Sequence, residues 1–265
     1  TTIGLTVGSV LVAANSAQAA SFTSNVTTTE FGSKGDIILN SITQGDETFS
    51  NFSYVESVNS FSNTEYTGGN SGAASTDKGD LASSPEARME DATASNIAAF
   101  LGNNNLNNIV DGEGRTFSMD IKFDSFLSVD DSGLDNLFFW ERGENSDLTI
   151  QALDELGNVV GIEKRLVRKV DQDYAGFDIN TMEIGGAQRV GSWGVSLGDL
   201  GITTGGIRGI RVSADSSHKG PDFKVIARAS SGPGDFAKAS VPEPGTIIGL
   251  GSVAALAFFR RRKAK

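Results

Sequence analysis

Several segments of the chain alternate hydrophobic and polar residues with a period of two. Successive side chains of a β-strand point to opposite faces, so this pattern predicts half-buried strands. The clearest cases are 117–123, 148–152, 193–197 and 223–227. Less regular candidates are 36–42, 48–61, 136–142, 159–167 and 207–213. The turn at 156–158 contains Gly157 and Asn158, which tolerate positive φ, and it predicts a hairpin.

One helix interrupts this pattern. Ser84 as N-cap, Pro85 and Glu86 give a start signal, and Gly102 gives a stop signal, with a division near 93–96. The polar segments 63–83 and 102–108 are predicted to be surface loops. With about nine strands and no βαβ rhythm, we expect a mainly β fold, an antiparallel β-sandwich of jelly-roll type with one short helical excursion.

Both ends of the chain differ from this body. Residues 1–19 carry no charge, and an apolar run precedes Ala17-Gln18-Ala19. This layout predicts a secretory signal peptide, truncated at its start, that signal peptidase cleaves after Ala19. A buried N-terminal strand or helix is the alternative.

The C-terminus has three parts in a fixed order. Val241-Pro242-Glu243-Pro244 precedes an uncharged run at 245–259, and Arg260-Arg261-Arg262-Lys263 follows it. The run would form a helix of roughly 22 Å, and long basic side chains that reach the interface help it to span a bilayer. The basic residues hold that end in the cytoplasm, so the body would lie outside. We expect a body at 20–229, a flexible linker at 230–240 and a sorting segment at 241–265.

This tripartite end resembles the PEP-CTERM sorting signal. The resemblance implies cleavage near Pro242-Glu243-Pro244 by an exosortase and transfer of the body to the cell surface or extracellular matrix. A plain C-terminal membrane anchor is the alternative. Parts of the body at 137–148, 183–195 and 220–225 are similar to exosortase-dependent surface proteins, a family found largely in cyanobacteria. That likeness implies a surface location and no catalytic residues.

Charge narrows the range of partners. The chain has 265 residues, a net charge of −11 and a pI of about 4.6, and removing the tail, whose net charge is +4, leaves a body near −15. Such acidity argues against nucleic-acid binding. The absence of Cys from the sequence excludes disulfides and Cys-ligated zinc, and a single His excludes multi-histidine metal sites.

Candidate chemistry is sparse. The segment 194–198 fits G-x-S-x-G, but Ser196 lies in a predicted strand, so a triad with His218 and Asp199 or Asp215 is disfavoured. His218 is predicted to be an exposed loop residue. Glu141 and Arg142 are expected to form an ion pair at a strand end, although Glu141 and Glu144 could also supply the acids of a glycoside hydrolase.

Two acidic clusters could bind calcium, which prefers many oxygen ligands. Asp130, Asp131 and Asp135 lie close in sequence, with Asp124 nearby, and a second cluster surrounds Tyr174. Neither fits the EF-hand spacing, so solvated acidic loops are the stronger interpretation and no cofactor is expected. Among the aromatic residues, Trp193 is predicted to be in the core, and Tyr66 and Tyr174 are freer to contact sugars.

Together these patterns favour an exported, exosortase-processed surface protein without catalysis of its own. It would be held transiently at the membrane and act at the envelope or in the polysaccharide matrix. The alternatives are a carbohydrate-binding module, with or without calcium, and a secreted glycoside hydrolase.

Overall fold

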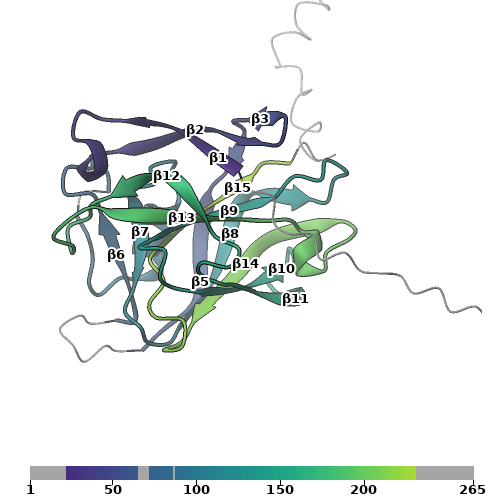
Figure 1. Ribbon diagram of the computed structural model, residues 1–265. Coiled ribbons are helices and arrows are strands. Elements are labelled where there is room, and N and C mark those ends of the chain that lie inside the picture. The colour runs from purple at the N-terminus through teal and green to yellow at the C-terminus, as the bar shows by residue number, and fades with distance from the viewer. Residues whose placement is uncertain (1–21, 65–71, 86, 231–265) are drawn as a thin grey trace, which may run out of the picture. The chain divides into compact units, whose positions relative to one another are not determined.

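The computed structural model describes residues 22–64, 72–85 and 87–230. These residues form three antiparallel sheets, shown in Figure 1. The central sheet has the order β12-β13-β9-β15-β7-β6, and β4 pairs with β15 outside this path. Its strands are β12 (Asp173–Ile179), β13 (Gln188–Val195), β9 (Leu137–Arg142), β15 (Phe223–Arg228), β7 (Asn108–Gly112), β6 (Ala74–Lys78) and β4 (Phe52–Ser53).

A second sheet packs on one face of the central sheet, and a third packs on the other. The five-stranded sheet consists of β11 (Val159–Leu166), β10 (Leu148–Leu153), β14 (Gly206–Ala214), β8 (Phe117–Ser128) and β5 (Val55–Asn63), in that order. The three-stranded sheet consists of β1 (Phe22–Thr28), β2 (Ile37–Gln44) and β3 (Glu47–Phe49). Two short 3₁₀ turns, η1 (Gly32–Lys34) and η2 (Gly198–Leu200), complete the secondary structure together with helix α1 (Ala94–Leu101).

Strand β9 explains why the central sheet is buried on both sides. Leu137 and Phe139 belong to the core shared with the five-stranded sheet, whereas Phe138 and Trp140 belong to the core shared with the three-stranded sheet. Because neighbouring residues of a strand point to opposite faces, a strand between two cores places apolar side chains on both faces, as the first four residues of β9 do. Trp140 also donates a hydrogen bond through Nε1 to Ser24 Oγ of β1 at 2.9 Å.

The mainly antiparallel β class predicted from the sequence is confirmed. The four alternating segments fall on strands β8, β10, β13 and β15, with Phe117, Met119, Ile121 and Phe123 all buried, although β13 ends at Val195 and Ser196 follows it. Gly157 turns the β10–β11 hairpin at φ +81°, as expected, and Asp154 accepts the backbone N–H groups of Leu156 and Asn158. The described part has fifteen strands rather than about nine, and its third sheet adds a layer to the predicted sandwich. The jelly-roll connectivity stays a prediction.

The predicted start of the helix is wrong, and its predicted end is right. Helix α1 begins after Thr93, whose side chain accepts from the backbone N–H of Asn96 while Asn96 caps Thr93 in return. This capping box outweighs the Ser84-Pro85 start signal. Gly102 closes the helix by donating its N–H to the carbonyl of Ala98.

Two predicted surface loops are also corrected. Strand β6 lies inside the segment 63–83. It pairs with β7, and all five of its residues are buried. In the segment 102–108, Asn105, Asn107 and Asn108 are buried. The side-chain amide of Asn107 donates to the backbone carbonyls of Ser33 and Gly35. This side chain therefore supplies hydrogen bonds to buried backbone groups and does not face solvent.

No helix within residues 22–64, 72–85 and 87–230 is long and apolar enough to cross a membrane. The predicted signal peptide, residues 231–240 of the predicted linker and the helix at 245–259 lie outside the described residues, as do Tyr66 and Glu86. Ser230, the first residue of the predicted linker, is buried, and its hydroxyl accepts the backbone N–H of Ser128 at 2.6 Å.

Candidate functional site

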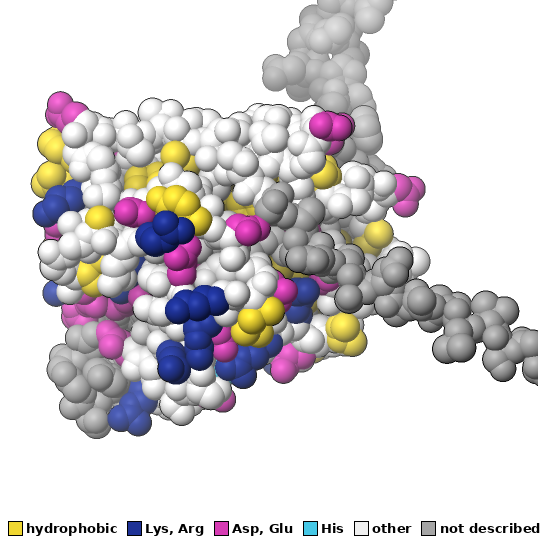
Figure 2. Space-filling model, in the orientation of Figure 1, with side chains coloured by type: hydrophobic (Ala, Val, Ile, Leu, Met, Phe, Trp, Pro, Cys, Tyr) yellow, Lys and Arg dark blue, Asp and Glu magenta, His cyan; other side chains and the backbone are white. Residues whose placement is uncertain are grey.

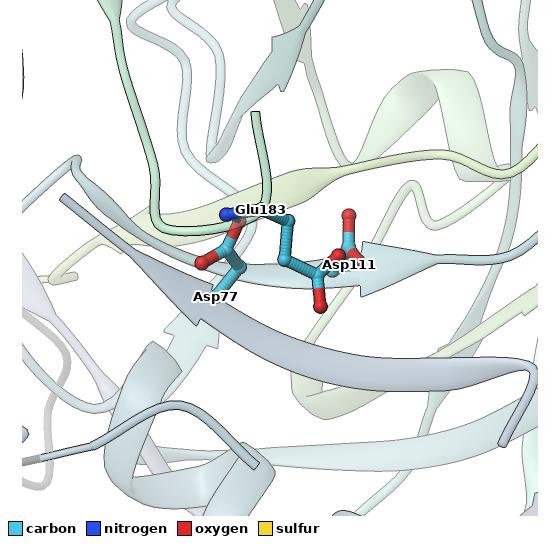
Figure 3. A group of neighbouring side chains, drawn as sticks. All are labelled: Asp77, Asp111 and Glu183. Carbon is cyan, nitrogen blue, oxygen red and sulfur yellow. Dashed lines mark hydrogen bonds between the residues drawn. The ribbon is translucent and has the colours of Figure 1, made fainter. Parts of the chain in front are cut away.

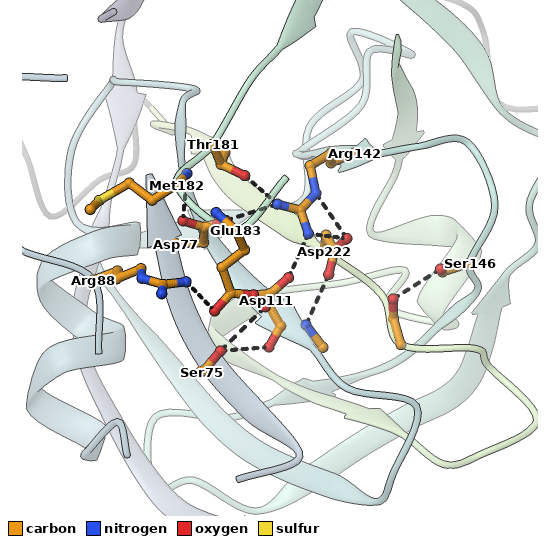
Figure 4. A network of polar contacts seen from close by, with 12 residues as sticks. Ser75, Asp77, Arg88, Asp111, Arg142, Ser146, Thr181, Met182, Glu183 and Asp222 are labelled. Carbon is orange, nitrogen blue, oxygen red and sulfur yellow. Dashed lines mark hydrogen bonds and ion pairs between the residues drawn. The ribbon is translucent and has the colours of Figure 1, made fainter. Parts of the chain in front are cut away.

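A buried charged cluster lies at one end of the central sheet. We call Asp77, Asp111, Arg142, Glu183 and Asp222 the Arg142 network. Asp77 lies on β6, Asp111 on β7 and Arg142 at the end of β9, while Asp222 precedes β15 and Glu183 follows β12. Antiparallel pairing of these strands brings residues up to 145 positions apart in sequence to one place, as Figure 4 shows.

Arg142 is the centre of this network. Its Nη1 donates to Asp77 Oδ2 at 2.9 Å and to the hydroxyl of Thr181, and its Nη2 donates to Asp111 Oδ1 at 2.6 Å. The guanidinium is only 6% exposed. Burial by itself would lower the pKa of Arg142, but the three surrounding carboxylates raise it above its usual value, so Arg142 stays charged.

The three carboxyl groups of Asp77, Asp111 and Glu183 lie close enough to be considered as metal ligands. One oxygen from each lies within 4.8 Å of the others, and Figure 3 shows the Glu183 side chain extending toward Asp111. Burial, followed by the bond to Asp111 and its charge, raises the pKa of Glu183 to about 10. The same hydrogen bond helps to hold the pKa of Asp111 below its usual value despite burial, so of these two carboxyl groups Glu183 keeps a proton more readily.

In this cluster the arginine guanidinium groups occupy the position that a metal ion would take. Calcium takes six to eight oxygens, and the oxygens of Asp77 and Asp111 already receive the guanidinium of Arg142. Arg88 adds a second cation, with Nη1 2.6 Å from Glu183 Oε1. The network joins β6, β7, β9 and the segments beside β12 and β15 at one end of the sheet.

The structure separates the calcium candidates of the sequence. Asp130 Oδ2 lies 2.9 Å from Arg228 Nη1, and Asp131 is exposed. Asp135 is buried, accepts from Gln44 Nε2 at 2.7 Å, and burial raises its pKa to about 6. In the described part of the chain, the group of acids that meets at ligand distance is the one in the Arg142 network. For the 130–135 loop, the lack of a cofactor stays the prediction and bound calcium stays its alternative.

The second acidic cluster of the sequence forms a strand instead of a loop. Residues Asp173–Ile179 are β12, and the Tyr174 hydroxyl donates to Asp178 Oδ1 at 2.9 Å. The Arg189 guanidinium lies 3.7 Å from the centroid of the Tyr174 ring, so one face of that ring is covered. Trp140 and Trp193 are both 1% exposed, which confirms the core position predicted for Trp193.

The predicted ion pair of Glu141 and Arg142 is wrong, because the two side chains point to opposite faces of β9. Glu141 is completely buried and accepts from Gln172 Nε2 at 3.1 Å through Oε2. Burial raises its pKa to about 8. Its other carboxyl oxygen has no hydrogen-bond partner among the described residues. Glu144 pairs instead with Arg189, at 2.9 Å.

Ser196 and His218 belong to separate hydrogen-bond groups. Ser196 Oγ donates to Asp199 Oδ2 at 2.9 Å, just before η2. His218 is 7% exposed, so its predicted exposure is wrong, and its ring contacts Thr149 Oγ1 at 2.9 Å and Asp215 Oδ1 at 2.8 Å. The serine is thus joined to a carboxylate but not to the imidazole that a nucleophile elbow requires.

The sorting and processing residues of the sequence, 241–244 and 260–263, and the signal cleavage residues Ala17 and Ala19 lie outside the described residues. Comparison with protein families identifies a PEP-CTERM protein-sorting motif at residues 240–263. The chain therefore carries the sorting motif of exported proteins that an exosortase processes. A search of curated proteins found no match, and neither did a search of solved structures. The resemblance within 137–225 stays a prediction.

Proposed function

We propose that this protein is delivered to the cell surface or extracellular matrix. There its β-rich body has a structural or binding role and no catalytic activity. The sorting motif at residues 240–263 is the observation that carries this proposal. In this mechanism the signal peptide starts export, and the helix at 245–259 holds the chain at the membrane. The exosortase then recognises Pro242-Glu243-Pro244, removes the tail and releases the body.

The contacts in the body support a non-catalytic role. The acids that meet at the end of the central sheet are bonded to Arg142 and Arg88, so they are occupied in holding the fold. Glu141 is completely buried, where it cannot serve as the acid of a glycoside hydrolase cleft. Ser196 and His218 lie in different hydrogen-bond groups.

The processing step is tested by the intact mass of the protein isolated from its native host. We expect a mass without residues 245–265 in the wild-type strain and an unprocessed chain in a strain lacking the exosortase. Replacing Pro242-Glu243-Pro244 by three alanines should also block processing. A matched control replaces Gly232-Pro233-Gly234, upstream in the linker, and should be processed normally. A wild-type protein that retains residues 245–265 would contradict the proposed processing.

A further inference from the structure

Three connections between strands meet at a pocket on the surface of the body. It has a volume of about 380 Å³ and is lined by Asn145, Arg168, Lys169 and Lys219, which we call the loop pocket. Asn145 lies between β9 and β10, Arg168 and Lys169 lie between β11 and β12, and Lys219 lies between β14 and β15. Three of its four lining residues are cationic, although the chain as a whole is strongly acidic.

The two lysines of the loop pocket differ from the other surface cations. Exposed Lys and Arg side chains of the described residues mostly pair with carboxylates, as Lys34 does with Asp80 and Lys122 with Glu56. No carboxylate within the described ranges forms an ion pair with Lys169 or Lys219. Figure 2 shows Lys and Arg side chains gathered in the lower half of the visible face, while acidic side chains are scattered more widely. Lysine side chains that line one pocket without a carboxylate partner attract an anion.

Buried polar contacts fix the three connections to one another. Ser146 is fully buried, and its hydroxyl oxygen lies 3.1 Å from the carbonyl oxygen of Lys219 and 3.0 Å from that of Gly220, within hydrogen-bond distance of both. Asp147 accepts the backbone N–H of Arg168 at 2.9 Å, and its own N–H donates to the carbonyl of His218 at 2.9 Å. The cationic side chains are thus presented by a rigid floor, which lowers the entropy lost when a ligand binds.

The backbone beneath the lysines is strained. Lys169 has φ +62° and Lys219 has φ +69°, and Glu144, beside Asn145, has φ +52°. Non-glycine residues rarely adopt this left-handed conformation, which is found preferentially at functional sites. Of the four non-glycine residues with positive φ in the described part, two line the loop pocket and a third, Glu144, directly precedes the lining residue Asn145.

The loop pocket also contains a neutral donor. The Asn145 side-chain oxygen lies 2.7 Å from Ser146 Oγ, and no hydrogen bond among the described residues uses the Asn145 amide nitrogen. Asp147, the carboxylate beneath the pocket, lies 3.1 Å from Arg168 Nη1 and 2.7 Å from Arg165 Nη2, so it is already balanced by two cations. Ammonium groups beside an amide suit a ligand that combines an oxyanion with hydroxyl groups.

We propose that the loop pocket binds the carboxylate of a uronic-acid unit in an extracellular acidic polysaccharide. This inference rests on the proposed delivery of the body to the outside of the cell, where such a polymer is accessible. Lys169 and Lys219 contact the carboxylate, Arg168 adds positive potential from one side, and Asn145 donates to a sugar hydroxyl. Neutral polysaccharides lack the charge that these groups recognise.

The test uses the full chain in a nonionic detergent and isothermal titration calorimetry at low salt. The probes are polygalacturonate, monomeric galacturonate, inorganic sulfate and the neutral polymer dextran. We expect both uronates to bind, with affinity that falls as salt is added, and dextran not to bind. Binding of sulfate without galacturonate would identify a site for free inorganic anions only and overturn the proposal, as would equal binding of dextran.

Two double variants separate the pocket from overall charge. K169Q/K219Q should weaken uronate binding by about tenfold or more, because it removes both charged donors. K34Q/K122Q removes the same charge elsewhere and should change affinity by less than about twofold. Both variants should keep the wild-type circular dichroism spectrum. Equal affinity of K169Q/K219Q and the wild type would overturn the proposal. Since binding is measured on the uncleaved chain, failure of exosortase processing does not affect this result.

Discussion

Arg142 donates two hydrogen bonds to one oxygen of Asp222, from Nε at 3.0 Å and from Nη2 at 2.8 Å. The same guanidinium also bonds Asp77 and Asp111, so a single side chain compensates three carboxyl groups inside the protein. Removing one partner of a buried charged group is far more destabilising than removing an exposed pair, because the remaining charges stay desolvated.

We therefore expect Arg142→Gln to lower the free energy of unfolding by about 3–5 kcal/mol. The matched control is Arg189→Gln on the neighbouring strand β13, whose pair with Glu144 is exposed and should have a much smaller effect because solvent screens it. Urea titration followed by tryptophan fluorescence measures both variants. Equal effects of the two substitutions would contradict the structural role of the Arg142 network.

Glu141 should make stability depend on pH. Burial raises its pKa to about 8, so the folded protein keeps this proton in a range where the unfolded chain, in which a glutamic acid has its ordinary pKa of 4.5, has lost it. The contribution of the protonated Glu141 carboxyl to the free energy of unfolding is fully present below about pH 4.5 and is lost as pH rises through 8. Glu141→Gln cannot ionise, and it should exceed the wild type in stability at pH 9 by a few kcal/mol, on the order expected for such a shift.

At pH 4 the Glu141→Gln variant and the wild type should be about equally stable. Thermal unfolding across pH 4–9 gives this comparison, and the other titrating groups cancel because both proteins contain them. Glu155→Gln, in the exposed β10–β11 turn, serves as the control and should follow the wild-type profile. A pH-independent difference between Glu141→Gln and the wild type would refute the prediction.

Lys169 and Lys219 should oppose stability. Each holds a left-handed backbone conformation that disfavours an L side chain by about 1 kcal/mol, and glycine adopts it without this penalty. Lys169→Gly and Lys219→Gly are each expected to raise the free energy of unfolding by up to about 1 kcal/mol. Lys122→Gly, within strand β8, should lower it. Chemical denaturation of the three variants checks the sign, and destabilisation at both loop positions would show that the lysines pack favourably.

The two-sided burial of β9 predicts similar effects at neighbouring positions. Phe138→Ala and Phe139→Ala each remove a fully buried ring, one from each core, and each should lower the free energy of unfolding by about 3–5 kcal/mol. Ile162→Ala, on β11 and 59% exposed, should change it by less than about 0.5 kcal/mol. A small effect at either phenylalanine would place that face of β9 toward solvent.

The strands with regular alternation could be predicted from the sequence because one face is apolar and the other polar. Segments 117–123 and 223–227 coincide with β8 and β15 for this reason. Strand β6, with the sequence Ala-Ser-Thr-Asp-Lys, has the small and polar composition of a loop, and it is a strand because β7 pairs with it. Tertiary pairing outweighs composition there.

The Arg142 network could not be predicted for a different reason. Its members are spread from residue 77 to residue 222, and each looks like an ordinary surface charge beside its sequence neighbours. Only strand order brings them together. One signal was present: β9 ends in Glu141 and Arg142 directly after an apolar run, and charged residues continuing a buried strand need buried partners.

The burial of β9 on both faces limits where this protein can change during evolution. A strand without an exposed side has no position at which a substitution alters the surface and leaves the core intact. Substitutions that alter the surface must therefore lie elsewhere, on strands with an exposed face such as β11 or in connections such as those that carry Asn145, Lys169 and Lys219. Exchange of such turn residues would change the surface chemistry of the body and leave both cores intact.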